Sequence, residues 1–395
     1  MTPKAINAVV LGLSPTGLYV ARELGSMGAN LLGVDRQHGC ASWSRYFRAG
    51  AGTWRERDDS QLLERLLKYS KVQSSLPVLF PTSDHYIEFV IANYDALSCR
   101  FRIFDCYQSV AANLLDKSMF LSLCQQYGIE GPRTWNIGHI DELSSIASDV
   151  TYPCLLKPAM IHRVKQLMPG KKAFICKNKD ELIRLLGTYP ESSCGWLVQE
   201  IVSGRESEIE LVAGYLGADQ SVSEVFTARK LRQYPPGFGS ASLAISDVCE
   251  ESERQVMRLL HAIGFKGVFG AEFKRDPVTG RLKIIEINPR PTLWFALANA
   301  SGKRVVETAM ADMAGLTVRA SVEQCNGVVW RYVLKDLASA FYYKRSGSQS
   351  VLPAPDVSAA CGVKSHSWAV FDLRDPMPVL AELIVYAKKG LRRFF

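Results

Sequence analysis

The most constraining stretch of the sequence is Leu282–Arg290, where an acid, an amide and a guanidinium follow an apolar strand pattern. Upstream, residues 267–275 predict a second strand. Residues 276–280, Asp-Pro-Val-Thr-Gly, have the composition of a hairpin turn. We therefore expect two antiparallel neighbouring strands that end in polar groups.

The expected pairing of this hairpin brings two acids together. If the two ends of the turn pair, Glu272 lies opposite Ile284. Side chains alternate along a strand, so Glu272, Glu286 and Asn288 are expected on one face, with the acids as diagonal neighbours roughly 7 to 8 Å apart. Two such carboxylates can hold hard divalent cations. The alternative is a pair of acids on a solvated strand face, and the apolar flanks argue against it.

Glu272, followed by Glu286-x-Asn288-x-Arg290, resembles the metal-binding signature of the ATP-grasp ligases, which include biotin carboxylase and the large subunit of carbamoyl phosphate synthetase. The resemblance implies that Glu272, Glu286 and Asn288 hold Mg²⁺ (or Mn²⁺) on the phosphates of ATP. It also implies that Arg290 contacts the reacting acyl phosphate. It extends over roughly residues 5–320 and favours the carbamoyl-phosphate-synthetase-like branch, the carboxylate–amine ligases.

Two lysines match further parts of this resemblance. Lys117 lies at a predicted helix start, where family members contact ATP phosphate. Lys157 ends an apolar strand pattern, and burying an unpaired ammonium costs several kcal/mol, so it needs an anionic partner. The resemblance assigns Lys157 to the α-phosphate and the adenine edge, and we expect it to be catalytic together with Arg290.

Other nucleotide contacts follow from the same resemblance. Glu200, Ile201 and Val202 are similar to the interdomain strand that binds adenine, and Glu206 or Glu208 is similar in place to the ribose acceptor, with Glu208 as our candidate. The segment 159–172 departs from the family pattern because it contains one glycine where a glycine-rich phosphate loop is usual. Its cations, Lys172 among them, are candidates for holding phosphates instead.

A basic and aromatic stretch, residues 229–239, resembles a segment of amino-acid ligases in the same branch. We expect it to face the second substrate. The alternative is simple turn formation, because Pro-Pro-Gly makes a turn in many contexts. Its candidate substrate contacts are Arg229, Lys230, Arg232 and Tyr234.

The predicted fold class is α/β, with a doubly wound parallel-sheet domain before a two-part ATP-grasp unit built from antiparallel sheets. We expect an N-terminal domain over 1–112, the ATP-grasp domain over 113–320 with a small lid at about 135–200, and a tail of unknown role over 321–395. An oxidoreductase is disfavoured because residues 12–17, Gly-Leu-Ser-Pro-Thr-Gly, do not match the dinucleotide-binding G-x-G-x-x-G pattern.

Composition narrows the function further. With 395 residues, 47% hydrophobic and 22% charged, the chain is typical of a globular enzyme. No long apolar run or signal-peptide pattern occurs, so we expect no transmembrane segment and a cytoplasmic location.

The ten cysteines lack paired-ligand spacing, which disfavours a zinc site. The net charge of +8 is spread out, which suits an anionic substrate rather than nucleic acid. The basic C-terminal end after residue 387 either touches a membrane surface or is a solvated helix end.

The resemblance implies that ATP phosphorylates a carboxylate, that an amine attacks the resulting acyl phosphate, and that ADP and phosphate are released. The expected cofactors are ATP and Mg²⁺ (or Mn²⁺). The expected partners are a small carboxylate and an amine, of the amino-acid class, and the resemblance is compatible with a homodimer. The alternatives are a carboxylase that uses bicarbonate and a nucleotide-binding module without catalysis. The sequence leaves the acid, the amine and the pathway open.

Overall fold

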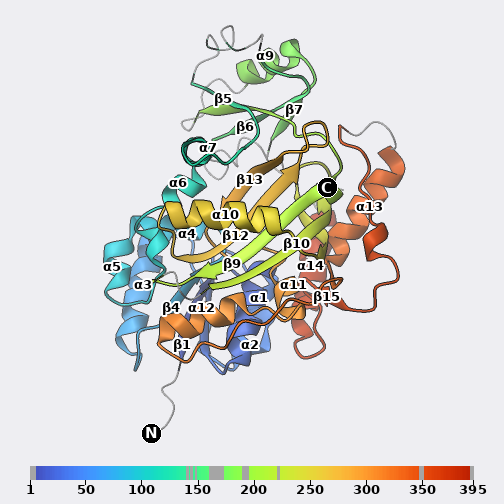
Figure 1. The fold of residues 1–395 in the computed structure, drawn as a ribbon. Coiled ribbons are helices and arrows are strands. Elements are labelled where there is room, and N and C mark those ends of the chain that lie inside the picture. Colours follow the sequence, from blue (N-terminus) through green and yellow to red (C-terminus); the bar gives the residue numbers. More distant parts are fainter. Residues whose placement is uncertain are drawn as a thin grey trace.

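The computed structural model describes residues 6–138, 142, 146, 149–159, 173–188, 195–219, 223–346 and 351–391. Three sheets organise this part of the chain (Figure 1). The N-terminal sheet is parallel, and its order reverses at its first strand, so it is doubly wound as predicted. In pairing order its strands are β3 (Gly52–Arg55), β2 (Asn30–Asp35), β1 (Asn7–Leu11) and β4 (Val78–Pro81).

Helices and short turns surround the N-terminal sheet. Two of the helices begin directly after the carboxyl ends of β1 and β4, which are neighbours in the sheet, so their N-termini open on the same edge. Open α/β sheets bind ligands at such an edge. The elements are α1 (Pro15–Ser26), η1 (Cys40–Trp43), α2 (Arg45–Arg48), α3 (Asp59–Lys71), α4 (Asp84–Ala92), α5 (Tyr94–Ser98) and η2 (Asp105–Tyr107).

A small sheet forms a separate unit at the top of Figure 1. It has its own apolar core, which includes Leu156, Trp196 and Val198. The helices that lead to it are α6 (Ala111–Leu115) and α7 (Lys117–Gln126). Its elements are β5 (Thr134–Ile137), β8 (Trp196–Glu200), β6 (Cys154–Pro158), β7 (Phe174–Cys176) and α9 (Lys179–Thr188).

The third sheet is the largest and runs across the middle of Figure 1. Its first six strands pair antiparallel, as predicted for the ATP-grasp unit, and the last pair is parallel. In pairing order the strands are β13 (Leu282–Asn288), β12 (Gly267–Arg275), β9 (Ile209–Leu216), β10 (Ser223–Tyr234), β11 (Ser240–Ser246), β14 (Val329–Arg331) and β15 (His366–Trp368). The segment after residue 320 thus adds two strands to this sheet.

Helix α12 contacts both β9 and α1, and one continuous apolar core runs through the large sheet and the N-terminal domain. The α/β class with a parallel N-terminal sheet and antiparallel sheets after it is therefore confirmed. In the described part of the chain, no helix has the length and apolar character needed to span a membrane. The remaining elements are η4 (Glu206–Glu208), α10 (Glu250–Ala262), α11 (Ala296–Ala300), α12 (Val305–Ala314), α13 (Val333–Ser346), η6 (Ser358–Ala360) and α14 (Met377–Leu391).

Candidate active site

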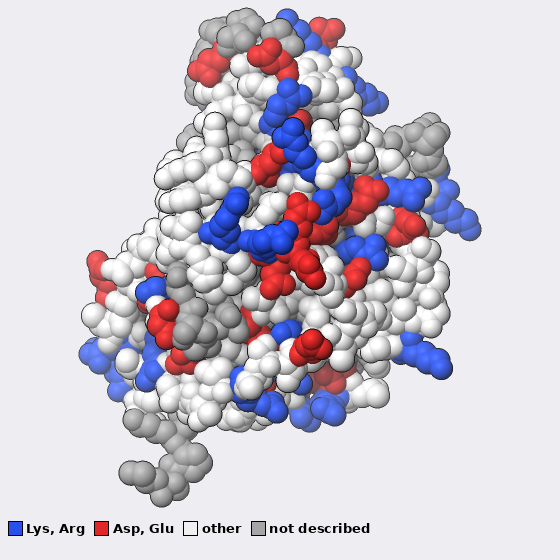
Figure 2. Space-filling model, viewed as in Figure 1, with Lys and Arg blue, Asp and Glu red and all other residues white. Residues whose placement is uncertain are grey.

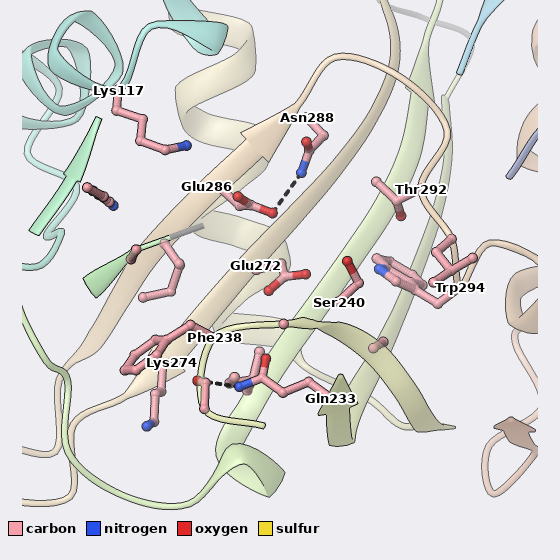
Figure 3. A pocket seen from close by; sticks show the side chains of 18 of the residues that line it. Lys117, Gln233, Phe238, Ser240, Glu272, Lys274, Glu286, Asn288, Thr292 and Trp294 are labelled. Atoms are coloured by element: carbon pink, nitrogen blue, oxygen red, sulfur yellow. Dashed lines mark hydrogen bonds between the residues drawn. The ribbon is translucent and has the colours of Figure 1, made fainter. Parts of the chain in front are cut away.

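A cavity of about 480 Å³ is lined by residues of the small and the large sheet, of the loops near them, and of the segments that follow β1 and β4 (Figure 3). Its volume is in the range of small-molecule sites. The edge where α1 and α4 begin forms part of its wall. Nine residues singled out from the sequence also line it: Lys117, Lys157, Glu200, Ile201, Val202, Glu272, Glu286, Asn288 and Arg290.

The register predicted for the hairpin is wrong. Glu272 pairs with Glu286 rather than with Ile284, an offset of two residues. One residue arises at the turn, where Arg275 pairs with Leu282 instead of Arg281, and the other is the extra residue of β13 at a bulge at Ile285. This bulge lets Ile284 stay fully buried in the core while Glu286 turns to the cavity. The two acids are therefore directly opposite, with Cβ atoms about 5 Å apart, rather than diagonal. The expectation of a shared face holds, since Glu272, Glu286 and Asn288 all line the cavity.

The three polar side chains of the hairpin are held by neighbours. Lys230 Nζ lies 2.5 Å from Glu272 Oε2, Asn288 Nδ2 donates to Glu286 Oε1 at 3.0 Å, and Arg290 Nη2 donates to Asn288 Oδ1 at 3.0 Å. Among the described residues, no cluster of three or more His, Cys, Asp or Glu side chains suits a metal ion. A cation here would have two carboxylates and an amide, which are the oxygen ligands that Mg²⁺ accepts.

Arg290 joins the hairpin to the N-terminal domain. Its Nη2 and Nε lie 2.6 and 2.8 Å from Asp84 Oδ1, at the first residue of α4. Burial raises the pKa of the Asp84 carboxyl, but the Arg290 guanidinium outweighs it and leaves that pKa below its usual range. Sequence reasoning missed Asp84, because in Thr82-Ser83-Asp84 it has the ordinary composition of a helix start.

Lys157 is the most perturbed cation in the cavity. It lies on β6, and its Nζ donates to the amide oxygen of Gln199 at 2.6 Å, so this partner carries no charge. Burial, and then the positive charge of Lys117, lower the pKa of Lys157 to about 7. Asp116 caps α7 and so places Lys117 at the first position of that helix, facing the cavity. Two cations drawn together in this way favour an anionic ligand.

Glu200 ends β8 with its carboxylate already paired. Lys283 donates to it, and Arg133 Nε lies 3.2 Å from its Oε2. Burial raises the pKa of Glu200, but hydrogen bonds from Lys283 and Arg133 bring it below its usual value. Glu200 is followed by Ile201 and Val202 in the cavity wall, so this edge offers backbone groups and apolar surface beside a fixed carboxylate.

Lys274 was not predicted, although the signal was available. It is two residues beyond Glu272 on β12, so strand alternation places both on one face, and both line the cavity. Its Nζ donates to the carbonyl oxygens of Val202 and Gly204, both at 2.9 Å. Burial lowers the pKa of Lys274 to about 8. Lys172 and the rest of the segment 160–172 lie outside the described residues.

The two candidate ribose acceptors have different surroundings. Neither Glu208 nor Glu206 lines the cavity. Glu208 accepts from the backbone nitrogen of Arg205 at 3.0 Å. Glu206 is fully buried and accepts from the backbone nitrogens of Gln233 and Gly237, at 3.1 and 2.5 Å, and from the hydroxyl of Tyr343 at 2.5 Å. Glu206 therefore anchors the turn after β10, which forms part of the cavity wall.

This anchoring predicts a large difference between the two acids. Glu206→Ala leaves several buried donors without an acceptor and is expected to lower the free energy of unfolding by about 3 kcal/mol or more. Glu208→Ala is expected to cost less than about 1 kcal/mol. Denaturant unfolding of the two variants measures both values. Equal destabilisation would contradict the anchoring role of Glu206.

The four substrate candidates do not line the cavity. Arg229 Nε lies 2.6 Å from Asp247, and Arg232 Nη1 lies 2.8 Å from Asp336 of α13. Lys230 is buried and reaches the site through Glu272, while Tyr234 begins the turn that Glu206 anchors. The turn itself meets the cavity through Gly237, Phe238 and Gly239. The stretch 229–239 is therefore next to the site, mainly through backbone and turn residues.

No family model matches the chain. A D-aspartate ligase from Enterococcus faecium is 24% identical over 249 residues, an alignment that covers 59% of this chain and 58% of that protein. The chain therefore matches little more than half the length of this curated relative.

Solved structures match over a larger share of the chain. An N5-carboxyaminoimidazole synthetase from Staphylococcus aureus has a TM-score of 0.62 and 14% identity, covering 81% of this chain and 80% of that one. The biotin carboxylase domain of the Hydrogenobacter thermophilus 2-oxoglutarate carboxylase, solved with MgADP and bicarbonate, has a TM-score of 0.62 and 15% identity, covering 82% of this chain and 73% of that one. These likenesses establish the fold.

Proposed function

We propose that this chain, which has the ATP-grasp fold, is an ATP-dependent carboxylate–amine ligase. It forms an amide bond through an acyl phosphate and releases ADP and phosphate. The observation that carries the proposal is the pair of opposed acids, Glu272 and Glu286, in a cavity that also holds Lys157 and Arg290. Opposed carboxylates repel one another, and a divalent cation between them relieves that repulsion.

In this proposal the nucleotide lies between the small and large sheets. Lys117 and Lys157 hold its phosphates, with Lys172 as a further contact, and Glu200, Ile201 and Val202 receive the base. Glu272, Glu286 and Asn288 hold Mg²⁺ (or Mn²⁺), which would neutralise charge on the transferring phosphoryl group. The opposed acids and the amide fit such an ion by ligand type.

The acid to be activated lies against Arg290. The Arg290 guanidinium, fixed by Asp84 and Asn288, holds the carboxylate of this substrate and stabilises the charge that develops when the acyl phosphate forms. The cavity continues toward Thr292 and Trp294, where the buried Thr292 Oγ1 has no hydrogen-bond partner in the described part of the chain (Figure 3). We assign this end to the second substrate, and the relative named D-aspartate ligase supports an amino acid as its class. A cytoplasmic location with access to ATP and a homodimer are further parts of the proposal.

A carboxylase is the second candidate, favoured by the likeness to the domain solved with bicarbonate. The test is a screen of the purified full chain for ADP release from MgATP, with pooled amino acids and small carboxylates, in the presence and absence of bicarbonate. The ligase proposal predicts ADP release that needs an acid and an amine but not bicarbonate. ADP release that requires bicarbonate would favour the carboxylase, and no release under any condition would favour a module without catalysis.

We expect Lys157 to take up a proton when ATP binds. With a pKa of about 7, Lys157 is mostly neutral at about pH 8, and an anionic phosphate beside it favours the charged form. Binding of ATP at about pH 8 should therefore add nearly one proton, and at about pH 6, where Lys157 is already charged, much less. Calorimetry in buffers of different ionisation enthalpy measures this uptake. Uptake that persists unchanged in Lys157→Arg would contradict the assignment.

A further inference from the structure

Helix α14 exposes an apolar face instead of burying it. Leu380, Leu383 and Ile384 are 50%, 48% and 43% exposed, and their spacing places them on one side of the helix. A surface helix ordinarily turns such a stripe toward the core. Nine of the eighteen exposed large hydrophobic side chains in the described residues lie between 333 and 384, so the exposure is concentrated rather than scattered.

The neighbouring helix α13 has the same character. Val333, Leu337 and Phe341 recur every four residues and are 39%, 59% and 65% exposed. Tyr332, just before α13, donates a hydrogen bond to Glu382 of α14, so the start of α13 lies beside α14. The exposed apolar surface therefore belongs to two adjacent helices.

Neither helix offers a carboxylate to solvent. The only acid of α14 is Glu382, which is buried against Tyr332. The only acid of α13 is Asp336, which is buried in ion pairs with Arg232 and Arg331. The exposed faces of both helices are thus apolar or basic, without negative charge.

Positive charge lies at the surface beside α13 (Figure 2), and the sequence adds basic residues at the end of α14. Helix α13 ends with the exposed Lys344 and Arg345. Helix α14 includes Lys388 and Lys389, and the sequence continues with Arg392-Arg393-Phe394-Phe395. Helix α14 also contacts η1, where Trp43 is 38% exposed. An apolar stripe with flanking cations and aromatic residues is typical of helices that lie in the plane of an anionic lipid surface.

We propose that α14, flanked by α13, docks the protein on an anionic membrane surface. The apolar side chains enter the lipid boundary, and the cations meet the headgroups. A second copy of the chain would offer these cations no exposed acid from either helix, because Asp336 and Glu382 are buried, whereas anionic headgroups can pair with them. This binding requires neither ATP nor the proposed ligase activity.

Sedimentation of the full-length protein with vesicles tests this proposal without nucleotide. We expect binding to phosphatidylcholine vesicles that contain phosphatidylglycerol, little binding to phosphatidylcholine alone, and weakening by salt. Leu383→Glu/Ile384→Glu should abolish the binding. Lys344→Gln/Arg345→Gln, at the exposed end of α13, should weaken it about 25-fold, since each cation near an anionic surface contributes about fivefold.

Leu316→Glu/Val322→Glu is the matched control, because these side chains are 42% and 55% exposed outside both helices. It should bind as the wild type does. The proposal is overturned if the wild type does not bind the anionic vesicles, or if the Leu383→Glu/Ile384→Glu protein binds them equally well. It is also overturned if the protein forms a dimer that this double variant dissociates while neither form binds vesicles, because the face is then a subunit interface.

Discussion

Glu286→Gln is expected to lower the rate of ADP formation at least about 10³-fold while the protein stays folded. Glu286 lies directly opposite Glu272 in the cavity, and a divalent ion between them needs both charges. An amide at this position removes one negative ligand but keeps the shape of the side chain. A steady-state assay at ordinary Mg²⁺ concentration, with a thermal unfolding scan, measures both expectations.

Glu130→Gln is a matched control on the surface. Glu130 is 38% exposed and pairs with Arg281, at the turn of the same hairpin, at 3.1 Å. An exposed pair of this kind contributes at most about 1 kcal/mol, so activity should hardly change. If the Glu286→Gln protein retained wild-type activity, Glu286 would not be a metal ligand.

Arg290→Lys is expected to lower kcat about 10²- to 10³-fold while ATP binding changes less than about threefold. A lysine keeps the charge but cannot contact Asp84 and Asn288 together as the guanidinium does. The loss should appear in the chemical step, because the proposed contact strengthens as charge develops on the acyl phosphate. Single-turnover kinetics and calorimetry with ATP separate the two quantities.

Arg281→Lys provides the same substitution away from the cavity, at a side chain that is 68% exposed. It should leave both kcat and ATP affinity unchanged. A loss of ATP affinity in Arg290→Lys that matches its loss of kcat would mean that Arg290 supports nucleotide binding instead of the acyl transfer.

The strands of the hairpin and their antiparallel pairing could be predicted, because the pattern there is local. Apolar runs and the turn composition at residues 276–280 indicated the hairpin, and alternation along β12 and β13 placed Glu272, Glu286 and Asn288 on one face. The exact pairing could not be predicted, because the turn places Arg275 opposite Leu282 and the bulge at Ile285 depends on how Ile284 fits the core. Bulges of this kind are set by tertiary packing rather than by local sequence.

Contacts between residues far apart in the sequence could not be predicted either. Asp84 meets Arg290 from 206 residues away, and Tyr343 meets Glu206 from 137 residues away. The local sequence does not distinguish Asp84 from an ordinary residue at a helix start, or Glu206 from a solvated acid. Distant contacts also explain why the substrate candidates do not line the cavity. The composition of residues 229–239 suggested a binding loop, but Arg229 and Arg232 pair with acids outside the cavity.

Transfer of an oxygen atom tests the acyl-phosphate proposal most directly. The full-length protein is given MgATP, an amine and the acid identified in the screen, with oxygen-18 in the carboxylate. Attack of the carboxylate on the terminal phosphoryl group moves one labelled oxygen into inorganic phosphate, so we predict labelled phosphate, ADP and the amide in equal amounts. Label in AMP, together with release of pyrophosphate, would contradict the acyl phosphate and the roles assigned to Glu272, Glu286 and Arg290.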